Sequence, residues 1–166
     1  MPIATNELTR IAVGVSDMKV SADPHSYLVT YSLGSCIGVV MHDPASRVAG
    51  LLHFQLPDSK GHEQRAANNP HMFADTGIPL LFSQMQAQGA RRERLVLGMF
   101  GGASMLDDQK LFKIGIKNTR AAKKILWQNC VSVKHEDVGG SVSRTISVEV
   151  ATGRVTLKSQ GQTISF

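Results

Sequence analysis

Two short apolar runs joined by a turn constrain the fold of this chain more than any other feature. Residues 36–41 (CIGVVM) are rich in β-branched side chains, and residues 48–56 (VAGLLHFQL) are again apolar after the turn Asp43-Pro44-Ala45-Ser46. Runs of this length and composition are typical of buried strands. Because the connection is short, the sequence predicts that these two strands are antiparallel neighbours.

The rest of the chain adds more strands, and the short connections between those up to residue 56 favour antiparallel neighbours. Apolar and β-branched runs predict them at residues 11–15, 27–31, 95–100, 131–133, 145–150 and 155–157. Thr152-Gly153 predicts a hairpin turn between the last two. With residues 27–31, 36–41 and 48–56 as neighbours, Thr30, Cys36 and His53 are expected near one end of a sheet.

Two segments have the period of amphipathic helices. Residues 71–88 form the first, ended by Gly89, with one apolar face made of Ile78, Leu81, Phe82 and Met85. Residues 114–127 form the second, with Trp127 expected to pack near its end. Residues 57–70 are polar and show no packing pattern, which predicts a binding loop or lid. The predicted fold class is α+β: a sheet-rich α/β sandwich with about two packed helices, in a single domain over residues 1–166.

Composition places the chain among globular proteins of the cytoplasm. Its 166 residues are 42% hydrophobic and 19% charged, and no apolar run reaches the length of a membrane span. The first residues lack the basic and apolar regions of a signal peptide. The chain has two cysteines, and a cytosolic location predicts that they stay reduced, so a disulfide between Cys36 and Cys130 is disfavoured.

The net charge is +5, and the basic residues concentrate in residues 91–94 and 113–124. Binding to nucleic acid is one interpretation, but aromatic residues make up only 5% and no stacking or zinc-binding motif is present. Solvated helix ends are a second interpretation. A third is a basic face that attracts an acidic protein partner.

Cys36 is the strongest candidate for chemistry. It follows Gly34 and Ser35 at a glycine-bent turn, where a thiolate can be reached by substrate. The backbone N–H groups of Cys36 and Ile37 are candidates for an oxyanion hole. The alternative is structural, because a free cysteine often packs as a small hydrophobic residue. Cys130, beside Val131, is expected to be such a core residue.

His53 is the best candidate for a base that takes the Cys36 proton. It lies between Leu52 and Phe54 on a predicted strand, so a buried histidine satisfied by a carbonyl is the alternative. Thr30 can orient His53 through its hydroxyl, although a buried strand threonine is also ordinary. Three other histidines are expected in turns or exposed strands: His25, His42 and His135. No metal site or cofactor is predicted.

Several short blocks of sequence, taken in order, resemble the CheD family of bacterial and archaeal chemotaxis proteins. The resemblance covers residues 9–158, and its blocks are LGSC at 33–36, LH at 52–53 with LP at 56–57, FGGA at 100–103, IG at 114–115 with Asn118, and DVGG at 137–140 with Arg144. This chain departs from the family pattern at Gln55, where the family usually has methionine, and at Gly98-Met99, where it often has a lysine.

The resemblance implies a fold related to the deamidating bacterial cytotoxins and an enzyme that deamidates chemoreceptor glutamines. Within the family, Cys36 matches the nucleophile, His53 the general base and Thr30 the residue that orients the base. Chemoreceptors are the implied partners, and a CheC-type phosphatase is a further one. Some members also hydrolyse receptor glutamate methyl esters. Receptor adaptation segments are acidic helices, so Arg91, Arg92, Arg94, Lys123 and Lys124 are expected to form the docking face.

Three alternatives remain open on the sequence. The first is a non-catalytic adaptor that binds receptor and a CheC-type protein, although such an adaptor does not need Cys36, His53 and Thr30. The second is a thiol transglutaminase or esterase on the same scaffold, because these differ only in leaving group and acceptor. The third, nucleic-acid binding, is the weakest.

Overall fold

The computed structural model describes residues 7–104 and 109–166, without the side chains of residues 109–112. Its strands are β1 (Thr9–Ala12), β2 (Asp17–Ser21), β3 (Ser26–Leu33), β4 (Ile37–Asp43), β5 (Val48–Phe54), β6 (Val96–Gly101), β7 (Val133–Val138), β8 (Arg144–Glu149), β9 (Val155–Ser159) and β10 (Gln162–Ser165). Its helices are α1 (Glu63–Asn68), α2 (Ala74–Ala87) and α3 (Gln109–Gln128), with 3-10 turns η1 (Pro70–Met72) and η2 (Arg92–Arg94).

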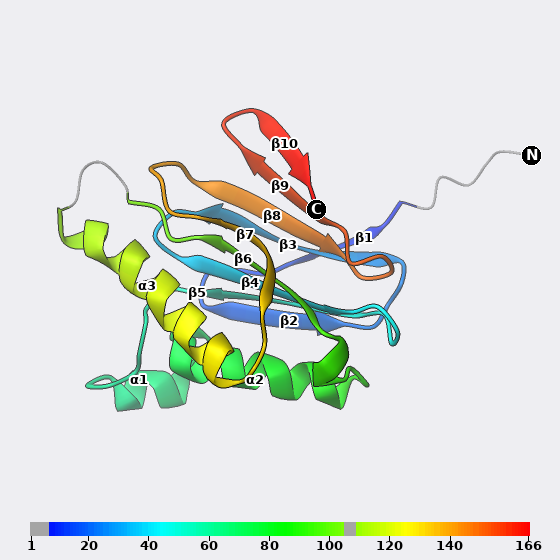
Figure 1. The fold of residues 1–166 in the computed structure, drawn as a ribbon, viewed down its shortest axis with the longest axis horizontal. Helices are drawn as coiled ribbons and strands as arrows, with labels where there is room; N and C mark the ends of the chain where they lie inside the picture. The colour runs from blue at the N-terminus through cyan, green and yellow to red at the C-terminus, as the bar shows by residue number, and fades with distance from the viewer. Residues whose placement is uncertain (1–6, 105–108) are drawn as a thin grey trace, which may run out of the picture.

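The strands form two five-stranded sheets that pack face to face, and helices cover the outer face of one of them (Figure 1). The first sheet has the order β1-β3-β8-β9-β10 and the second β2-β5-β4-β6-β7. Helices α2 and α3 lie on the second sheet, where their apolar faces join its core. This arrangement confirms the predicted α+β sandwich with two packed helices.

The hairpin predicted from the apolar runs is confirmed and lies at the centre of the second sheet. β4 and β5 are antiparallel, with Ile37 opposite Phe54 and Gly38 opposite His53. Every residue of both strands is buried. Both faces of this sheet are covered, one by the other sheet and one by helices, which explains why these strands read as continuous apolar runs.

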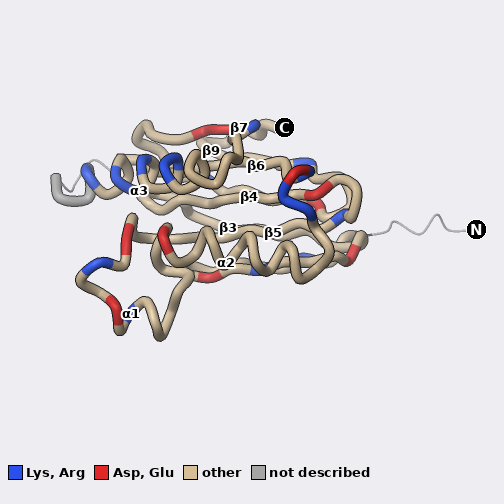
Figure 2. Tube along the Cα trace, turned by 60° about the horizontal axis from the view of Figure 1, so that its bottom comes forward, with Lys and Arg blue, Asp and Glu red and all other residues tan. Residues whose placement is uncertain are grey.

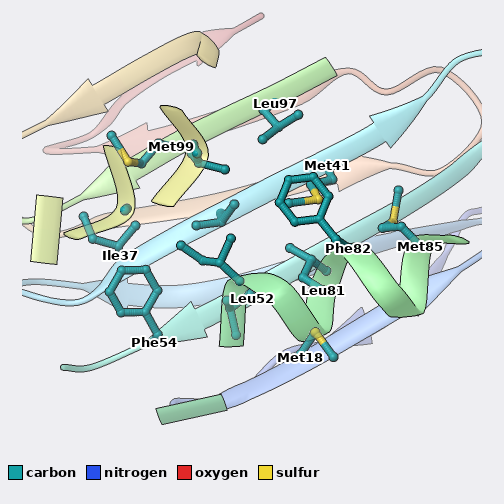
Figure 3. Packing of buried hydrophobic residues seen from close by; sticks show 14 of the residues in the cluster. Met18, Ile37, Met41, Leu52, Phe54, Leu81, Phe82, Met85, Leu97 and Met99 are labelled. Atoms are coloured by element: carbon teal, nitrogen blue, oxygen red, sulfur yellow. The ribbon is translucent and has the colours of Figure 1, made fainter. Parts of the chain in front are cut away.

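Two separate apolar clusters follow from this layering. Between the sheets, residues such as Leu28, Leu51 and Phe100 pack together. Between the second sheet and the helices, β4 and β5 contribute Ile37, Met41, Leu52 and Phe54, which meet the side chains of α2 (Figure 3). The four α2 residues predicted to form its apolar face are all buried: Ile78, Leu81, Phe82 and Met85. Gly89 follows the helix with a left-handed φ of 99°, as expected of a helix end.

The pairing expected for residues 27–31 is wrong. β3 belongs to the first sheet, where it pairs with β8 and, in parallel rather than antiparallel orientation, with β1, while β4 belongs to the second sheet. The chain crosses between the sheets after Leu33, and Ser32 there has a φ of 57° where the register of β3 shifts. A short connection therefore turns a corner of the sandwich here instead of closing a hairpin.

The polar loop predicted over residues 57–70 contains the short helix α1, of which only Ala66 is buried. A helix with one buried residue has no apolar period, so the sequence pattern did not reveal it. Strands β2 and β10 were not predicted either, because four- and five-residue edge strands carry little signal.

Three side chains are placed differently from expectation. Trp127 is 78% exposed and does not pack against the core. Cys130 is exposed and is not a core residue. His42 is buried rather than exposed, with its Nε2 atom 2.9 Å from the carbonyl oxygen of Val150.

Candidate active site

Cys36 lies immediately before β4, at the end of the second sheet. The residue after it, Ile37, pairs with Phe54 on one side and with Gly101 on the other. Cys36 is half-buried and packs against the apolar cluster between the sheets. Cys36 and Cys130 are both free thiols, so the disulfide considered for them is absent from the structure.

The backbone around Cys36 is held by close contacts with the glycines that end β6. Gly102 N–H donates to the Cys36 carbonyl over 2.8 Å, and Ala103 N–H donates to the Gly34 carbonyl over 2.8 Å. A side chain at Gly101, whose φ is 113°, would collide with the Cys36 carbonyl. Gly101 and Gly102 therefore form a tight turn, which positions the candidate nucleophile.

Arg144 holds the opposite side of that glycine turn. Its guanidinium is almost fully buried and donates to the carbonyls of Gly101 and Gly139 and to the carboxylate of Asp137. The same Gly101 carbonyl also accepts from Gly139 N–H. Residues of two blocks far apart in sequence, FGGA and DVGG, are thus bonded into one support behind Cys36.

His53 and Thr30 meet across the interface between the two sheets. His53 lies on β5 and Thr30 on β3, and both are fully buried. The Thr30 Oγ1 atom is 2.7 Å from His53 Nδ1 and 2.8 Å from the carbonyl oxygen of Val13. Gly38, opposite His53, leaves no room for a side chain because Leu33 and Ile146 of the first sheet press against it.

These two contacts fix the tautomer of His53. A carbonyl oxygen only accepts, so the one hydroxyl hydrogen of Thr30 is donated to Val13. The hydroxyl oxygen then accepts a hydrogen bond from His53 Nδ1–H, which leaves Nε2 without a proton in the neutral ring. That Nε2 atom is buried and has no hydrogen-bond partner in the described part of the chain. A neutral histidine held this way presents a free lone pair, as a general base requires.

Burial keeps both reactive groups neutral. Removal from water raises the pKa of the Cys36 thiol, an effect that its own backbone N–H opposes. Burial likewise lowers the pKa of His53 to about 4. No hydrogen bond joins the two side chains in the described structure. The thiol and the imidazole are therefore both neutral in the resting protein and do not form an ion pair.

A cavity of about 260 Å³ opens onto Cys36 from the helical side of the molecule. Its lining comes from the nucleophile turn, the residues after β5, and helices α1 and α3, namely Ser35, Cys36, Gln55, Leu56, Arg65, Met72 and Ile114. Gln55, one of the departures from the family pattern, is thus part of its wall, and its side chain accepts from Ser16 Oγ over 2.7 Å. His53 lies behind this wall and does not line it.

Asn118 is a residue whose part in the site sequence reasoning missed. It is fully buried on α3, and its Nδ2 atom donates to the Ser35 carbonyl over 2.9 Å and to the Gln55 carbonyl over 2.8 Å. One amide therefore joins the turn before Cys36 to the strand end after His53. In the sequence, Asn118 stood out only as part of the family block that begins at Ile114-Gly115, and that block did not reveal these contacts.

The described residues contain neither a cluster of metal ligands nor a helix suited to span a membrane. Within residues 7–104 and 109–166, no three His, Cys, Asp or Glu side chains lie together as metal ligands would. In the same residues, no helix has the length and apolar character needed to span a membrane.

Comparison with known proteins identifies the family. The family model described as CheD chemotactic sensory transduction matches residues 55–159. This chain belongs to the CheD family. The matched segment contains the glycine turn, Asn118 and Arg144 and begins after His53.

Curated relatives extend the match over most of the chain. A "Probable chemoreceptor glutamine deamidase CheD 2" from Anaeromyxobacter dehalogenans is 47% identical over 93% of this chain and 98% of that protein. A "Probable chemoreceptor glutamine deamidase CheD 1" from Syntrophus aciditrophicus is 46% identical over 91% of this chain and 94% of its own length. A third, from Solibacter usitatus, is 46% identical over 93% of this chain.

Proposed function

We propose that this CheD-family chain is a chemoreceptor glutamine deamidase that uses Cys36 as nucleophile, His53 as general base and Thr30 as the residue that orients the base. The names of its relatives supply the reaction and the class of substrate. The observation that carries the mechanism is the Thr30–His53 contact of 2.7 Å, with the Thr30 hydroxyl bonded to Val13. It leaves His53 Nε2 free to accept a proton from the neighbouring thiol.

The first half of the reaction releases ammonia. A receptor glutamine side chain enters the cavity beside Cys36, His53 Nε2 takes the thiol proton, and the sulfur attacks the carboxamide carbon. The N–H groups of Cys36 and Ile37 stabilise the oxyanion. Gly34 and Ser35 shape the turn that presents these groups. Protonated His53 then gives its proton to the leaving nitrogen, the C–N bond breaks, and a thioester remains.

The second half restores the enzyme. His53 takes a proton from water, which attacks the thioester carbon, and the C–S bond breaks as the proton returns to sulfur. The products are glutamate and the free Cys36 thiol. Because burial favours the neutral forms of both groups, proton transfer has to accompany attack rather than precede it.

The proposal includes a cytoplasmic location, where free thiols persist, and a single domain over residues 1–166. A CheC-type phosphatase is a further proposed partner, on the family resemblance alone. Cleavage of receptor methyl esters is chemically allowed at the same site, because an ester differs from an amide only in its leaving group. An adaptor without activity is the competing function.

Mass spectrometry of a chemoreceptor cytoplasmic fragment tests the proposal. Incubation with the protein should add about one dalton at particular glutamines, and a Cys36→Ala control should add none. Unchanged receptor mass, with binding retained, would reject the deamidase and support the adaptor. A mass change that persists in the Cys36→Ala control would reject the mechanism.

A further inference from the structure

The outward face of α3 carries a row of positive charges. Lys113, Lys117, Arg120 and Lys124 lie at helical spacings of four, three and four residues, and all are exposed. The helix has six lysines and arginines in its 20 residues and no acidic residue. Figure 2 shows these charges on successive turns of α3.

The four cations of this row make no ion pair with any described residue. Their neighbour Lys123 is different, since it lies 2.6 Å from Glu136 on β7. Like charges at these spacings repel one another and weaken a helix. The row therefore contributes nothing favourable to folding through charge, and its charges are available to a partner.

The arginines that the sequence suggested as part of the docking face are mostly engaged in the fold. Arg94 binds the buried Asp43 carboxylate at 2.7 Å. Arg92 lies over the Phe82 ring, 4.7 Å from its centroid, and donates to Asn129 over 3.1 Å. Of the five predicted docking residues, Arg91 and Lys124 make no ion pair with a described residue, and Lys124 belongs to the row on α3.

The row connects two hollows on the surface. At one end, Ile114 of α3 lines the cavity of Cys36. At the other end lies an open, largely apolar groove of about 850 Å³ between α3 and β7, lined by Leu126, Trp127, Cys130, Val131 and Val133. Trp127 is 78% exposed beside it. An exposed tryptophan next to an apolar groove is typical of a protein-binding surface.

We propose that the outward face of α3, from Lys113 to Trp127, is the docking surface for an acidic helical segment of the substrate protein. This rests on the proposed deamidase function. The surface spans 14 residue steps, or about 21 Å, enough for about four turns of a partner helix. The cations pair with its carboxylates, Trp127 and the groove bind an apolar side chain, and a glutamine of the same protein enters the cavity beside Cys36.

The reaction itself increases the charge complementarity between this surface and the substrate. Each deamidation replaces a neutral amide by a carboxylate, so the substrate becomes more acidic with every turnover. A basic surface beside the active site therefore binds a processed segment more tightly than an unprocessed one. An affinity that rises with deamidation therefore distinguishes an acidic protein segment from nucleic acid or an anionic membrane, because the enzyme does not change the charge of the latter two.

Binding to a chemoreceptor cytoplasmic fragment tests the surface without needing catalysis. In the Cys36→Ser protein, we expect Lys117→Glu with Lys124→Glu to weaken binding at least tenfold. The control is Arg47→Glu with Lys158→Glu, which changes net charge equally at exposed cations without ion pairs in the described structure and should leave affinity within twofold. A fragment with glutamate at every target glutamine should bind the parent protein more tightly, and the α3 double variant should lose that preference.

Cys130 provides a second readout that does not depend on charge variants. It is the only cysteine left in the Cys36→Ser protein and lies exposed at the groove. A benzophenone maleimide placed there should crosslink to the receptor fragment, and Trp127→Ala should reduce the yield severalfold. A crosslink at Cys130 that Trp127→Ala leaves unchanged, or no crosslink, would contradict the proposal.

Other outcomes separate this surface from the proposed activity. If the wild-type protein binds through α3 but deamidates nothing, the proposed activity is rejected and the docking surface is supported. If the Lys117→Glu, Lys124→Glu variant with Cys36 intact deamidates the fragment with the same KM, the docking surface is rejected and the proposed activity is supported. Equal receptor binding by both double variants, or an α3 effect confined to anionic vesicles or an oligonucleotide, would also overturn it.

Discussion

Buried polar groups have different hydrogen-bonding environments at the two ends of strand β4. At its C-terminal end, Asp43 is fully buried and accepts hydrogen bonds from Arg94, Arg91 N–H and Ala45 N–H. Burial alone would raise its pKa, but these donors hold the pKa well below the usual range. At the N-terminal end, burial raises the pKa of the Cys36 thiol and lowers the pKa of His53, and His53 Nε2 has no hydrogen-bond partner among the described residues. One end contributes stability, and the other keeps unsatisfied groups that can react.

Losing the base should produce the largest effect. We expect His53→Gln to lower the deamidation rate by about 10²–10⁴-fold, the range for a general acid–base residue. The free energy of unfolding should fall by about 1–3 kcal/mol, because the bond between His53 Nδ1–H and Thr30 Oγ1 is lost. Single-turnover rates on a receptor fragment and urea unfolding of the same preparations measure the two quantities. A variant that is fully active would remove His53 from the mechanism.

The opposite result is expected at the other end of the strand. Asp43→Ala should lower the free energy of unfolding by about 3 kcal/mol, since several donors lose a buried acceptor. The deamidation rate per folded molecule should stay within about twofold, because Asp43 is at the far end of β4 from Cys36. Urea unfolding with activity measured well below the transition tests both. A large activity loss in the folded protein would break the contrast between the two ends.

Thr30 lies between these extremes because it acts through His53. Thr30→Val removes the hydroxyl and with it the choice of tautomer, and we expect a loss of about ten- to a hundredfold in kcat. Thr30→Ser keeps the hydroxyl and should restore most of the rate. Steady-state kinetics on the receptor fragment distinguish the two. Equal rates for the valine and serine variants would show that orientation of His53 does not depend on this hydroxyl.

Asn118 should affect both stability and rate, each modestly. Asn118→Ala removes the two hydrogen bonds to the Ser35 and Gln55 carbonyls, so we expect about 1–3 kcal/mol of destabilisation and a kcat lowered by about tenfold. Asn129→Ala is the matched control immediately after the end of α3, where the side chain donates to Ile125 and accepts from Arg92. It should cost stability without lowering kcat. Equal effects on kcat would assign Asn118 to folding alone.

The smallest effect concerns pH. His53 has a pKa of about 4 in the folded protein and an ordinary value near 6.5 when unfolded. Its stabilising contribution is complete above pH 6.5 and is lost as the pH falls toward 4, because the unfolded chain binds the proton first. Between pH 6.5 and 5.5 the loss from this group is about 1 kcal/mol.

Comparison with the His53→Gln protein isolates this contribution, since buried His42 also has a lowered pKa and acts in the same direction. The difference in unfolding free energy between the two proteins should shrink or change sign as the pH falls. Parallel pH curves would mean that His53 is not neutralised by burial.

Much of the fold follows from local patterns in the sequence. The apolar runs at residues 36–41 and 48–56 predicted a buried hairpin, and the 3.6-residue period predicted α2 with its inner face and α3. Trp127 shows where this reasoning stops. At the end of an amphipathic helix the same period fits a packed side chain or an exposed one, and only the position of β7 decides that Trp127 faces a groove.

The sequence by itself determined which residues are candidates for chemistry: a cysteine between glycines, a histidine on an apolar strand and a threonine upstream. Only the tertiary structure decided how they meet. Thr30 reaches His53 from the opposing sheet rather than from a neighbouring strand, and Asn118 joins two loops from a third layer. Strand pairing depends on local turns and periodicity, whereas contacts between layers depend on how whole sheets stack, and no spacing within the chain encodes that distance.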